Sequence, residues 1–408
     1  MKATLNSGCL FIGLTLILGL SAPAHSQQPQ QQTVEPLEGY LATPEQLEFD
    51  EALLERLQLP DGFEINVFAQ DLGNPRKLAV APNGTVFVTL RDDGEVLALM
   101  DRNGDGRMDE KRTVASNVDY VNGIIVHENQ LYFVTDTTLY SAALGADGMP
   151  AAPQVLIDDL PDAGQHPNRT LGFGPDGMLY ISVGSTCNAC DEPNDEHATL
   201  LRAQPDGSNR EIYAEGLRNT IGFTWHPETS ELWGMDHGSD WRGNDSPPEE
   251  LNRIAPGEHY GWPFCWGDRQ PDVYLPAEPD SMTKEEFCAT TQPPVLTYQA
   301  HSAPLDMLFY NASQFPQEYQ GDAFVTMRGS WNRQPPVGYE VVRIRFENGQ
   351  PVAFEDFVTG FLTEDGSAQF GRPVGMATLP DGSLLFTDDT NGVIYRVAYT
   401  GEDNAPAR

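Results

Sequence analysis

The chain repeats one pattern six times: an apolar strand, a short polar turn and a second apolar strand, as in LGFGPDGMLYISVGS. A third strand follows most copies and a fourth often comes next, with the copies mostly about 45–65 residues apart. The copies lie at 78–90, 124–136, 171–185, 223–236, 305–327 and 376–388. This repetition predicts an all-β fold, a six-bladed β-propeller of four-stranded antiparallel blades.

The last copy lacks an outermost strand, and the segment FEINVFAQ at 63–70 can supply it. An N-terminal strand in the last blade would close the ring through both ends of the chain and leave no long unpaired edge. A pair of β-sandwiches is the alternative, but the repeats run without a linker between two halves. We therefore expect one propeller domain over residues 60–400.

The N-terminus is typical of a secretory signal peptide, with a lysine, a short apolar run and small residues before position 27. A signal peptide over 1–26 implies a periplasmic or secreted protein. A flexible polar leader is expected at 27–42 and a short tail at 401–408. Residues 43–58 predict one short helix. Its predicted features are a Thr43 cap, Pro44 in the first turn, Gln46 in a capping box, and an apolar face of Leu47, Leu54 and Leu57.

The formal net charge is −36, with only 24 lysines and arginines. Such a surface repels phosphate polymers and anionic lipid, which disfavours nucleic acids and membrane surfaces as partners. No stretch beyond the signal peptide is apolar enough to span a membrane. The acidity favours solubility and encounter with cationic partners.

Four cysteines remain after signal cleavage, an even number that suits disulfides in an exported chain. The simplest pairing joins Cys187 to Cys190, within CNAC, and Cys265 to Cys288. A redox or metal-binding pair is the alternative for CNAC. Zinc would need a second C-x-x-C, and haem attachment a following histidine, and the sequence has neither.

Cationic residues gather just before the predicted inner strands, where the loops of a propeller meet at one mouth of its channel. Five of the six loops contain a histidine or an arginine. They bring Arg76, His166 with Arg169, Arg218 with Asn219, His301 and Arg372. In a chain so poor in cations, this gathering predicts an anionic ligand, because arginine binds carboxylates in a bidentate fork. Pairing of each arginine with a nearby Asp or Glu is the alternative.

His166 is the candidate general base, since an imidazole can accept a proton near neutral pH. His226, in the turn WHPE, is expected at the opposite rim and without a role in the chemistry. Gly238 and Ser239 break a strand at a point where their backbone carbonyls could turn toward the channel. Carbonyl oxygens beside carboxylates are ligands that Ca²⁺ accepts.

A second calcium candidate is the segment DRNGDGRMDE at 101–110. Asp101, Asn103, Asp105 and Asp109 match the first half of an EF-hand-like loop, although Arg112 stands at the twelfth position. A structural calcium loop between two outer strands is expected. An Asp-Gly turn without metal is the alternative.

Five strings in this order carry a family resemblance: GLRNTIGFTWHP, MDHGSDW, EELNRI, HYGWP and GRPVGMATLPDG. They resemble the soluble quinoprotein sugar dehydrogenases, the glucose/sorbosone dehydrogenase group that uses pyrroloquinoline quinone (PQQ). The resemblance covers nearly all of the chain after about residue 60. The segment 321–344 looks most similar to the L-sorbosone-dehydrogenase-like branch.

The resemblance implies PQQ and Ca²⁺ as cofactors. Arg218 matches the arginine beside the C5 carbonyl of PQQ, and Asn219 is its polar neighbour. Arg328 and Arg372 match cationic contacts to the cofactor, while Arg169 and Arg76 are further candidates at the same mouth. Gly238 and Ser239 match the pair whose carbonyls hold the Ca²⁺.

The implied reaction oxidises a sugar or sugar-derived aldehyde to a lactone or acid. His166 would take the hydroxyl proton while hydride moves from C1 of the sugar to C5 of PQQ, polarised by Ca²⁺. Electrons would then pass to an external acceptor such as a cytochrome or quinone. Gln165 and Val121 stand where glucose-oxidising members have Asp and Gln, so the sugar-facing contacts differ.

Two other functions fit six blades. Lactonase or esterase propellers hold a channel Ca²⁺ through Glu, Asn and Asp side chains, whereas the inner-strand loops here carry mostly Arg and His. A non-catalytic binding propeller would lack a matched base and cofactor arginines. The preference for the quinoprotein rests on the resemblance, because the fold alone supports all three.

Overall fold

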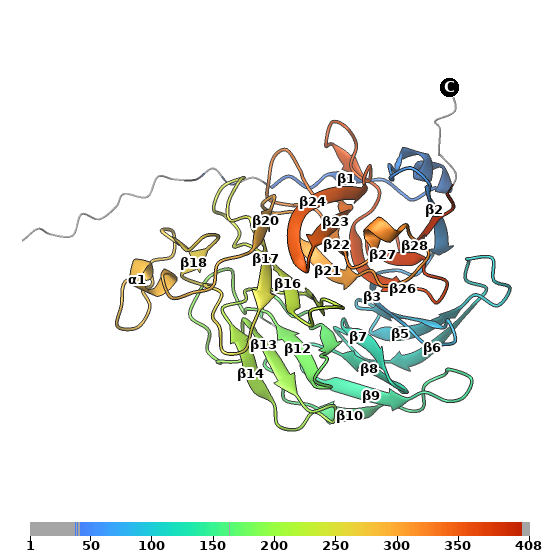
Figure 1. Cartoon of the computed structure of the whole chain (residues 1–408), viewed down its shortest axis with the longest axis horizontal. Helices are drawn as coiled ribbons and strands as arrows, with labels where there is room; N and C mark the ends of the chain where they lie inside the picture. Colours follow the sequence, from blue (N-terminus) through green and yellow to red (C-terminus); the bar gives the residue numbers. More distant parts are fainter. Residues whose placement is uncertain (1–36, 38, 40, 163, 402–408) are drawn as a thin grey trace, which may run out of the picture. The chain divides into compact units, whose positions relative to one another are not determined.

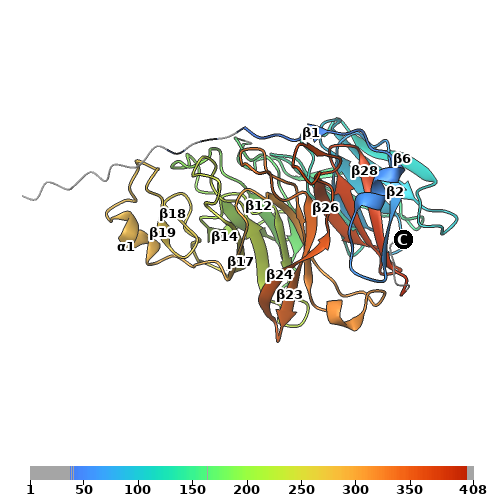
Figure 2. The same cartoon turned by 90° about the horizontal axis from the view of Figure 1, so that it is seen from above.

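A computed structural model describes residues 37, 39, 41–162 and 164–401. Six four-stranded antiparallel sheets follow one another along the chain (Figures 1 and 2). The predicted six-bladed β-propeller is therefore confirmed. The predicted signal peptide, most of the leader and most of the tail lie outside the described residues. Within the described part of the chain, no helix is long and apolar enough to cross a membrane.

In the first five sheets, the strands run from the innermost to the outermost in sequence order. In the last sheet, the outermost strand is β2, which comes from the start of the domain. The sheets are β3–β6 (Pro75–Val80, Val86–Leu90, Glu95–Met100, Glu110–Ser116); β7–β10 (Ile124–His127, Gln130–Val134, Leu139–Ala143, Gln154–Ile157); β11–β14 (Leu171–Phe173, Leu179–Val183, Thr199–Ala203, Glu211–Glu215); β15, β16, β17 and β20 (Gly222–Trp225, Leu232–Asp236, Glu249–Ile254, Leu296–Tyr298); β21–β24 (Pro304–Phe309, Ala323–Met327, Glu340–Glu347, Gln350–Val358); and β26, β27, β28 and β2 (Pro373–Thr378, Leu384–Asp388, Val393–Tyr399, Phe63–Ala69).

The two ends of the domain share the last sheet, as expected. Strand β2 pairs antiparallel with β28, with Phe63 opposite Tyr399. The Phe63 ring is 1% exposed and meets four aromatic rings edge-on, those of Phe315, Tyr319, Phe357 and Tyr399. Backbone pairing and aromatic burial thus close the ring together.

Neighbouring inner strands approach closely at glycine residues. A Cβ atom on Gly375 of β26 would lie 2.2 Å from the carbonyl oxygen of Arg76 in β3. One on Gly222 of β15 would lie 2.7 Å from the carbonyl carbon of Asp306 in β21. Only glycine allows this approach, which brings the loops before the inner strands to one end of the ring.

The apolar core lies between adjacent sheets. Val86 and Val88 of β4, for example, pack with Leu385 and Ile394 of the last sheet in one buried cluster. Alternate strand residues face the two neighbouring sheets, so the central strands read as continuous apolar runs. This packing makes the sheets a rigid support for the loops at the mouth.

The segment 43–58 differs from the prediction of one short helix. Glu45–Gln46 form a strand, β1, parallel to β25 (Ala368–Gln369), and a 3₁₀ helix, η1, spans Glu51–Arg56. Asp50 caps η1 by accepting the Ala52 N–H, so the Thr43 cap and the Gln46 capping box are wrong. Pairing with β25 overrides the local capping pattern, because tertiary contacts outweigh propensity. The three leucines nevertheless pack on the last two sheets.

An insertion after β17 carries β18 (Cys265–Trp266), β19 (Gln270–Pro271) and helix α1 (Lys284–Cys288). A second 3₁₀ helix, η2 (Gln317–Tyr319), lies between β21 and β22. Both predicted disulfides are formed, Cys187–Cys190 and Cys265–Cys288.

Candidate active site

The loops before the inner strands enclose a cavity of about 390 Å³. Five of the six loops identified in the sequence line this cavity, and the loop at 121–123 does not. Asn122 of that loop accepts a hydrogen bond from Arg76 Nε, and Arg76 does line the cavity. The charged and histidine side chains that line it are Arg76, Arg91, Arg218, Arg328 and Arg372, His166, His237 and His301, and Asp92, Asp240, Glu249 and Asp389. The predicted gathering of cations at one mouth is therefore present in the structure.

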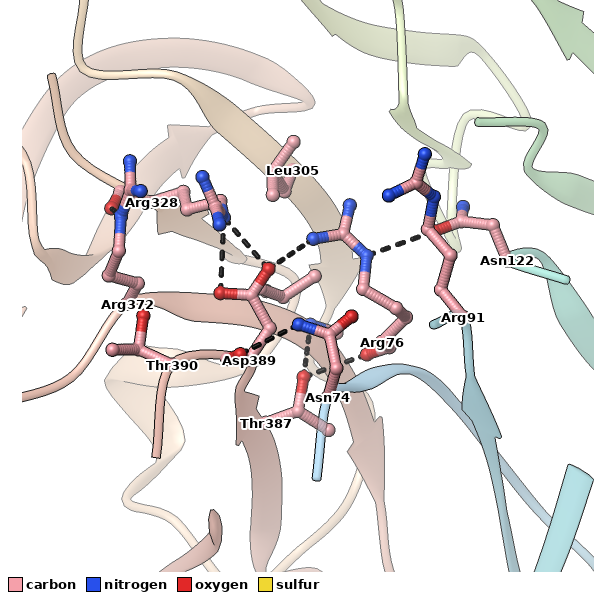
Figure 3. A network of polar contacts seen from close by, with 12 residues as sticks. Asn74, Arg76, Arg91, Asn122, Leu305, Arg328, Arg372, Thr387, Asp389 and Thr390 are labelled. Atoms are coloured by element: carbon pink, nitrogen blue, oxygen red, sulfur yellow. Dashed lines mark hydrogen bonds and ion pairs between the residues drawn. The ribbon is translucent and has the colours of Figure 1, made fainter. Parts of the chain in front are cut away.

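Asp389, just after β27, organises one wall of the cavity (Figure 3). Its carboxylate accepts the Arg328 Nε at 2.9 and 3.1 Å and pairs with Arg76 from another side. Burial opposes ionisation of Asp389, but Arg328 and Arg76 outweigh it and hold the pKa of this carboxyl below its usual value. The carboxylate therefore stays charged and fixes two guanidinium planes.

Each arginine of this wall keeps donors free. Arg76 uses Nε and Nη1, and Arg328 uses only Nε. Arg372 donates to the carbonyls of Arg328 and Gly329 at 3.0 and 2.8 Å. Among the described residues, no partner binds Nη2 of Arg76, either Nη of Arg328, or Nη1 of Arg372. Burial lowers the pKa of Arg76 and of Arg372 to about 10, so both remain cations at neutral pH.

Arg218 and Asn219 line the cavity from the loop before β15. Asp236 accepts the backbone N–H groups of Arg218 and Asn219 at 3.0 and 2.8 Å, which fixes this loop. The Arg218 guanidinium is held by Asn188 and, through Nη2 at 3.0 Å, by Asp240. Its Nη1 has no partner in the described part of the chain. Arg218 therefore presents one fixed, free N–H edge.

The His166 imidazole lines the cavity as a neutral base. Its Nδ1 lies 3.0 Å from the Ser185 carbonyl and 2.8 Å from the Ser185 Oγ. Since the Ser185 hydroxyl donates its own proton to the Cys187 carbonyl at 2.7 Å, both groups facing Nδ1 are acceptors. Nδ1 must carry the ring proton, which leaves the Nε2 lone pair available. Burial, then the charges of Arg218 and His237, lower the pKa of His166 to about 2.

Arg169 departs from its predicted role in cofactor binding. It is fully buried and does not line the cavity. Its guanidinium donates to the backbone carbonyls of Asp136, Pro161, Asp162 and His166. Because Asn122 also donates to the Arg169 carbonyl, the side chain braces the loop of His166 and does not face a ligand.

Gly238 lines the cavity and Ser239 lies in a smaller adjoining hollow. The Gly238 N–H donates to Glu249 Oε2 at 3.1 Å, and the Ser239 Oγ donates to the Asn188 carbonyl. Among the described residues, no donor reaches the carbonyl oxygen of either. Free backbone carbonyls beside the carboxyl groups of Glu249 and Asp240 fit the ligand chemistry of Ca²⁺. Burial raises the pKa of Glu249 to about 8.

The 101–110 loop joins β5 to β6, away from the cavity. Its side-chain oxygens already accept backbone N–H groups of the loop. Asp101 accepts those of Gly104 and Gly106, Asp109 those of Arg102 and Asn103, and Asp105 that of Arg107. Asn103 Nδ2 lies 3.1 Å from both Asp105 Oδ2 and Asp109 Oδ1, so three of the four predicted ligand side chains meet within the loop. The calcium loop stays a prediction.

Six charged or histidine side chains of the cavity had no predicted role: Arg91, Asp92, His237, Asp240, Glu249 and Asp389. His237 and Asp240 flank Gly238 and Ser239 within MDHGSDW, a string already singled out, so its polar residues could have been added. Burial lowers the pKa of His237 to about 4, and its Nε2 faces the Pro304 carbonyl. His226 is buried in the turn after β15, outside the cavity lining, and accepts two backbone N–H groups of that turn.

The fold and the cavity together define the class: a six-bladed β-propeller with a neutral histidine and free guanidinium edges facing one cavity at the mouth. The TrAA12-like family model matches residues 57–400, and the chain belongs to this family.

Two relatives illustrate the family. The chain is 30% identical over 365 residues to an uncharacterized protein of Borreliella burgdorferi, covering 86% of this chain and 92% of the relative. It is 28% identical to the pyrroloquinoline quinone-dependent pyranose dehydrogenase of Coprinopsis cinerea, covering 83% of this chain and 54% of that enzyme. The chain thus spans about half the length of the pyranose dehydrogenase.

Solved structures show the same fold at lower identity. The calcium structure of Trichoderma reesei Carbohydrate-Active Enzymes Family AA12 superposes with a TM-score of 0.72 at 22% identity, covering 84% of this chain and 97% of that one. The holo PQQ domain of the C. cinerea pyranose dehydrogenase gives 0.70 at 21%, with the same coverage. The apo soluble aldose sugar dehydrogenase of Escherichia coli gives 0.61 at 20%, covering 83% and 99%.

Proposed function

We propose that the protein is a PQQ-dependent dehydrogenase that oxidises a sugar or sugar-derived aldehyde to a lactone or acid. The observation that carries the proposal is the cavity itself, in which a neutral His166 with a free Nε2 faces the same space as unpartnered guanidinium N–H groups. Membership of the TrAA12-like family and the pyranose dehydrogenase relative support it.

The residues present fit PQQ with Ca²⁺. PQQ carries three carboxylates, and Arg76, Arg328 and Arg372 offer free N–H donors on one wall. The carbonyls of Gly238 and Ser239 would hold the Ca²⁺ on the other side. Bound together, PQQ and Ca²⁺ would supply a hydride acceptor and the Lewis acid that polarises it.

The chain's own groups then handle the proton and the charge. His166 Nε2 accepts the hydroxyl proton of the substrate, while the Nδ1–H stays bonded to Ser185 and keeps the ring oriented. The low pKa of His166 keeps the imidazole unprotonated at neutral pH, so that Nε2 is available to accept a proton. Arg218 presents Nη1 to negative charge that develops on the acceptor side.

The substrate is an aldose or a sorbosone-like aldehyde. Gln165 lines the cavity, whereas Val121 is fully buried and outside the lining, so the sugar-facing surface differs from a glucose site at both positions. An external acceptor such as a cytochrome or quinone receives the electrons. A net charge of −36 favours a cationic acceptor protein and a periplasmic or secreted setting suits the disulfides.

The test is dye reduction by the purified protein with added PQQ and Ca²⁺, over a panel of aldoses, 2-keto-aldehydes and lactones. We expect turnover that requires PQQ, falls with EDTA, and drops by on the order of 10²–10⁴-fold in His166→Asn. His226→Gln, outside the cavity, is the matched control and should keep its activity. Hydrolysis of a lactone without PQQ binding would refute the redox assignment and favour the lactonase class.

A further inference from the structure

The loop between β12 and β13 is closed by the Cys187–Cys190 disulfide, with a Cα–Cα distance of 6.2 Å. Asn188 lies inside this closed turn and bonds four residues around the cavity. Its backbone carbonyl accepts from Arg218 Nε at 3.0 Å, Trp262 Nε1 at 3.1 Å and Ser239 Oγ at 3.3 Å. Its side chain accepts from Arg218 Nη2 at 2.9 Å and the Asp240 N–H at 2.7 Å, and donates to the Asp240 carbonyl at 3.0 Å.

The same turn also reaches His166. The Ser185 hydroxyl donates a hydrogen bond to the Cys187 carbonyl and accepts one from His166 Nδ1. Without the Cys187 carbonyl, the Ser185 hydroxyl could donate to Nδ1, and only the Ser185 carbonyl, 3.0 Å away, would still favour a proton on Nδ1. In the other tautomer Nε2 is a donor and cannot act as a base.

We propose that the disulfide-closed turn 187–190 is a positioning element of the active site, which orients Arg218 through Asn188 and supports the Nδ1–H tautomer of His166 through the Ser185 hydroxyl. The role of the bridge is local. The Cys187–Cys190 bridge closes a loop of four residues, whereas Cys265 and Cys288 are 23 positions apart. The shorter bridge therefore restricts the unfolded chain much less than the longer one does. A short bridge of this kind fixes where two successive carbonyls, those of Cys187 and Asn188, point.

Asn188 also connects the turn to the proposed calcium segment. It bonds Ser239 and Asp240 directly, and Asp240 pairs with Arg218 at 3.0 Å. Opening the turn would therefore disturb the arginine and the carbonyl pair of Gly238 and Ser239 together. The inference about catalysis rests on the proposed dehydrogenase function, while the inference about side-chain positions does not.

The experiment separates the two contacts of the turn, through Ser185 to His166 and through Asn188 to Arg218. Ser185→Ala removes the hydroxyl link between the turn and His166 and keeps the Ser185 carbonyl contact. Asn188→Ala removes the side-chain link to Arg218 and Asp240, and Cys187→Ala/Cys190→Ala opens the turn. Cys265→Ala/Cys288→Ala is the matched control for loss of a disulfide. Each variant is crystallised without added cofactor, and each is assayed for PQQ affinity by tryptophan quenching with Ca²⁺ and for kcat and KM.

We expect Ser185→Ala to lower kcat with little change in PQQ affinity, and Asn188→Ala to weaken PQQ affinity. The turn-opening double variant should do both, each effect being on the order of 10–100-fold. The control should lose stability and keep affinity and kcat. In the crystals, the Arg218 guanidinium should leave its wild-type position in the turn-opening variant and shift less in Asn188→Ala, which keeps the Asn188 carbonyl and Asp240 as partners.

Two results would overturn the proposal: an unmoved Arg218 in both of these variants, or equal losses in the Cys265–Cys288 control. If the wild-type protein does not bind PQQ, the proposed function fails, but the crystallographic positions still decide whether the turn holds Arg218. If the double variant does not fold, the single variants Ser185→Ala and Asn188→Ala retain the disulfide and decide the question.

Discussion

Replacing Asp389 by alanine is expected to destabilise the protein by about 3–4 kcal/mol. Asp389 is the only carboxylate that the described residues place against both Arg76 and Arg328, and its side chain is 1% exposed. The substitution leaves two guanidinium groups facing each other without a counter-charge. Removing one partner of a buried ion pair is costly because the remaining charge stays desolvated.

The magnitude follows from the burial of each arginine. Arg76 is 5% exposed and cannot turn toward water, so it carries most of the loss. The Arg328 side chain is 29% exposed and can reorient into the cavity, so its share is small. With roughly 360 folded residues and an unfolding entropy of ~2.1 cal/mol/K per residue, ~3–4 kcal/mol corresponds to a fall in Tm of ~4–5 °C.

The assay is thermal and urea unfolding of Asp389→Ala beside Asp159→Ala. Asp159 forms an exposed pair with Arg210, which keeps Glu196 as a second partner. We expect a loss below about 1 kcal/mol for Asp159→Ala. Equal unfolding midpoints for Asp389→Ala and wild type, or equal losses in both variants, would refute the reasoning that Asp389 stabilises the arginine wall.

Three further predictions concern pH, ring closure and strand approach. Since the folded pKa of His166, about 2, lies below its unfolded value of 6.5, the stability that this group contributes above pH 6.5 is lost as the pH falls toward 2. Between pH 7 and pH 5, the free energy of unfolding measured in urea should therefore fall by ~1–2 kcal/mol less in His166→Asn than in the wild type. Phe63→Ala should cost ~3–5 kcal/mol by calorimetry, whereas Asn66→Ala, on the exposed side of the same strand, should cost less than ~0.5 kcal/mol. Gly375→Ala should lower Tm by several degrees, because its methyl group would meet the Arg76 carbonyl; an unchanged Tm would show that β3 and β26 can separate without cost.

Much of the fold was predictable because the propeller repeats its signal. Six copies of the pattern strand, polar turn and strand leave few other architectures, and the missing outer strand of the last copy pointed to closure by 63–70. The segment 43–58 was not predictable in the same way. Its capping pattern was a local signal, and the partner strand at 368–369 that overrides it is more than 300 residues away.

The cavity was predictable as a gathering of loops, while the partners of each side chain were not. His166, Arg218 and Arg372 could be placed at the mouth from their positions before inner strands. Arg169 also lies in a loop before an inner strand, three residues after His166. Its side chain nevertheless points into the backbone of that loop. Sequence position fixes the Cα location in a propeller, but the direction of a side chain depends on which carbonyls surround it.

The sequence left two explanations for the cavity arginines, binding of an anion or pairing with acidic residues, and the structure makes them compatible. Arg76 and Arg328 use one edge for Asp389, and Arg372 uses one edge for two carbonyls. A guanidinium is planar, so anchoring one edge fixes the direction of the other. Asp389 also offsets the repulsion among the clustered guanidinium groups before any ligand arrives. An anion that enters such a cavity meets donors that need little further ordering, and it loses less affinity to side-chain entropy. The acidic residue that lowers the net charge of the cavity thus contributes to anion binding, because it holds the free N–H groups in place.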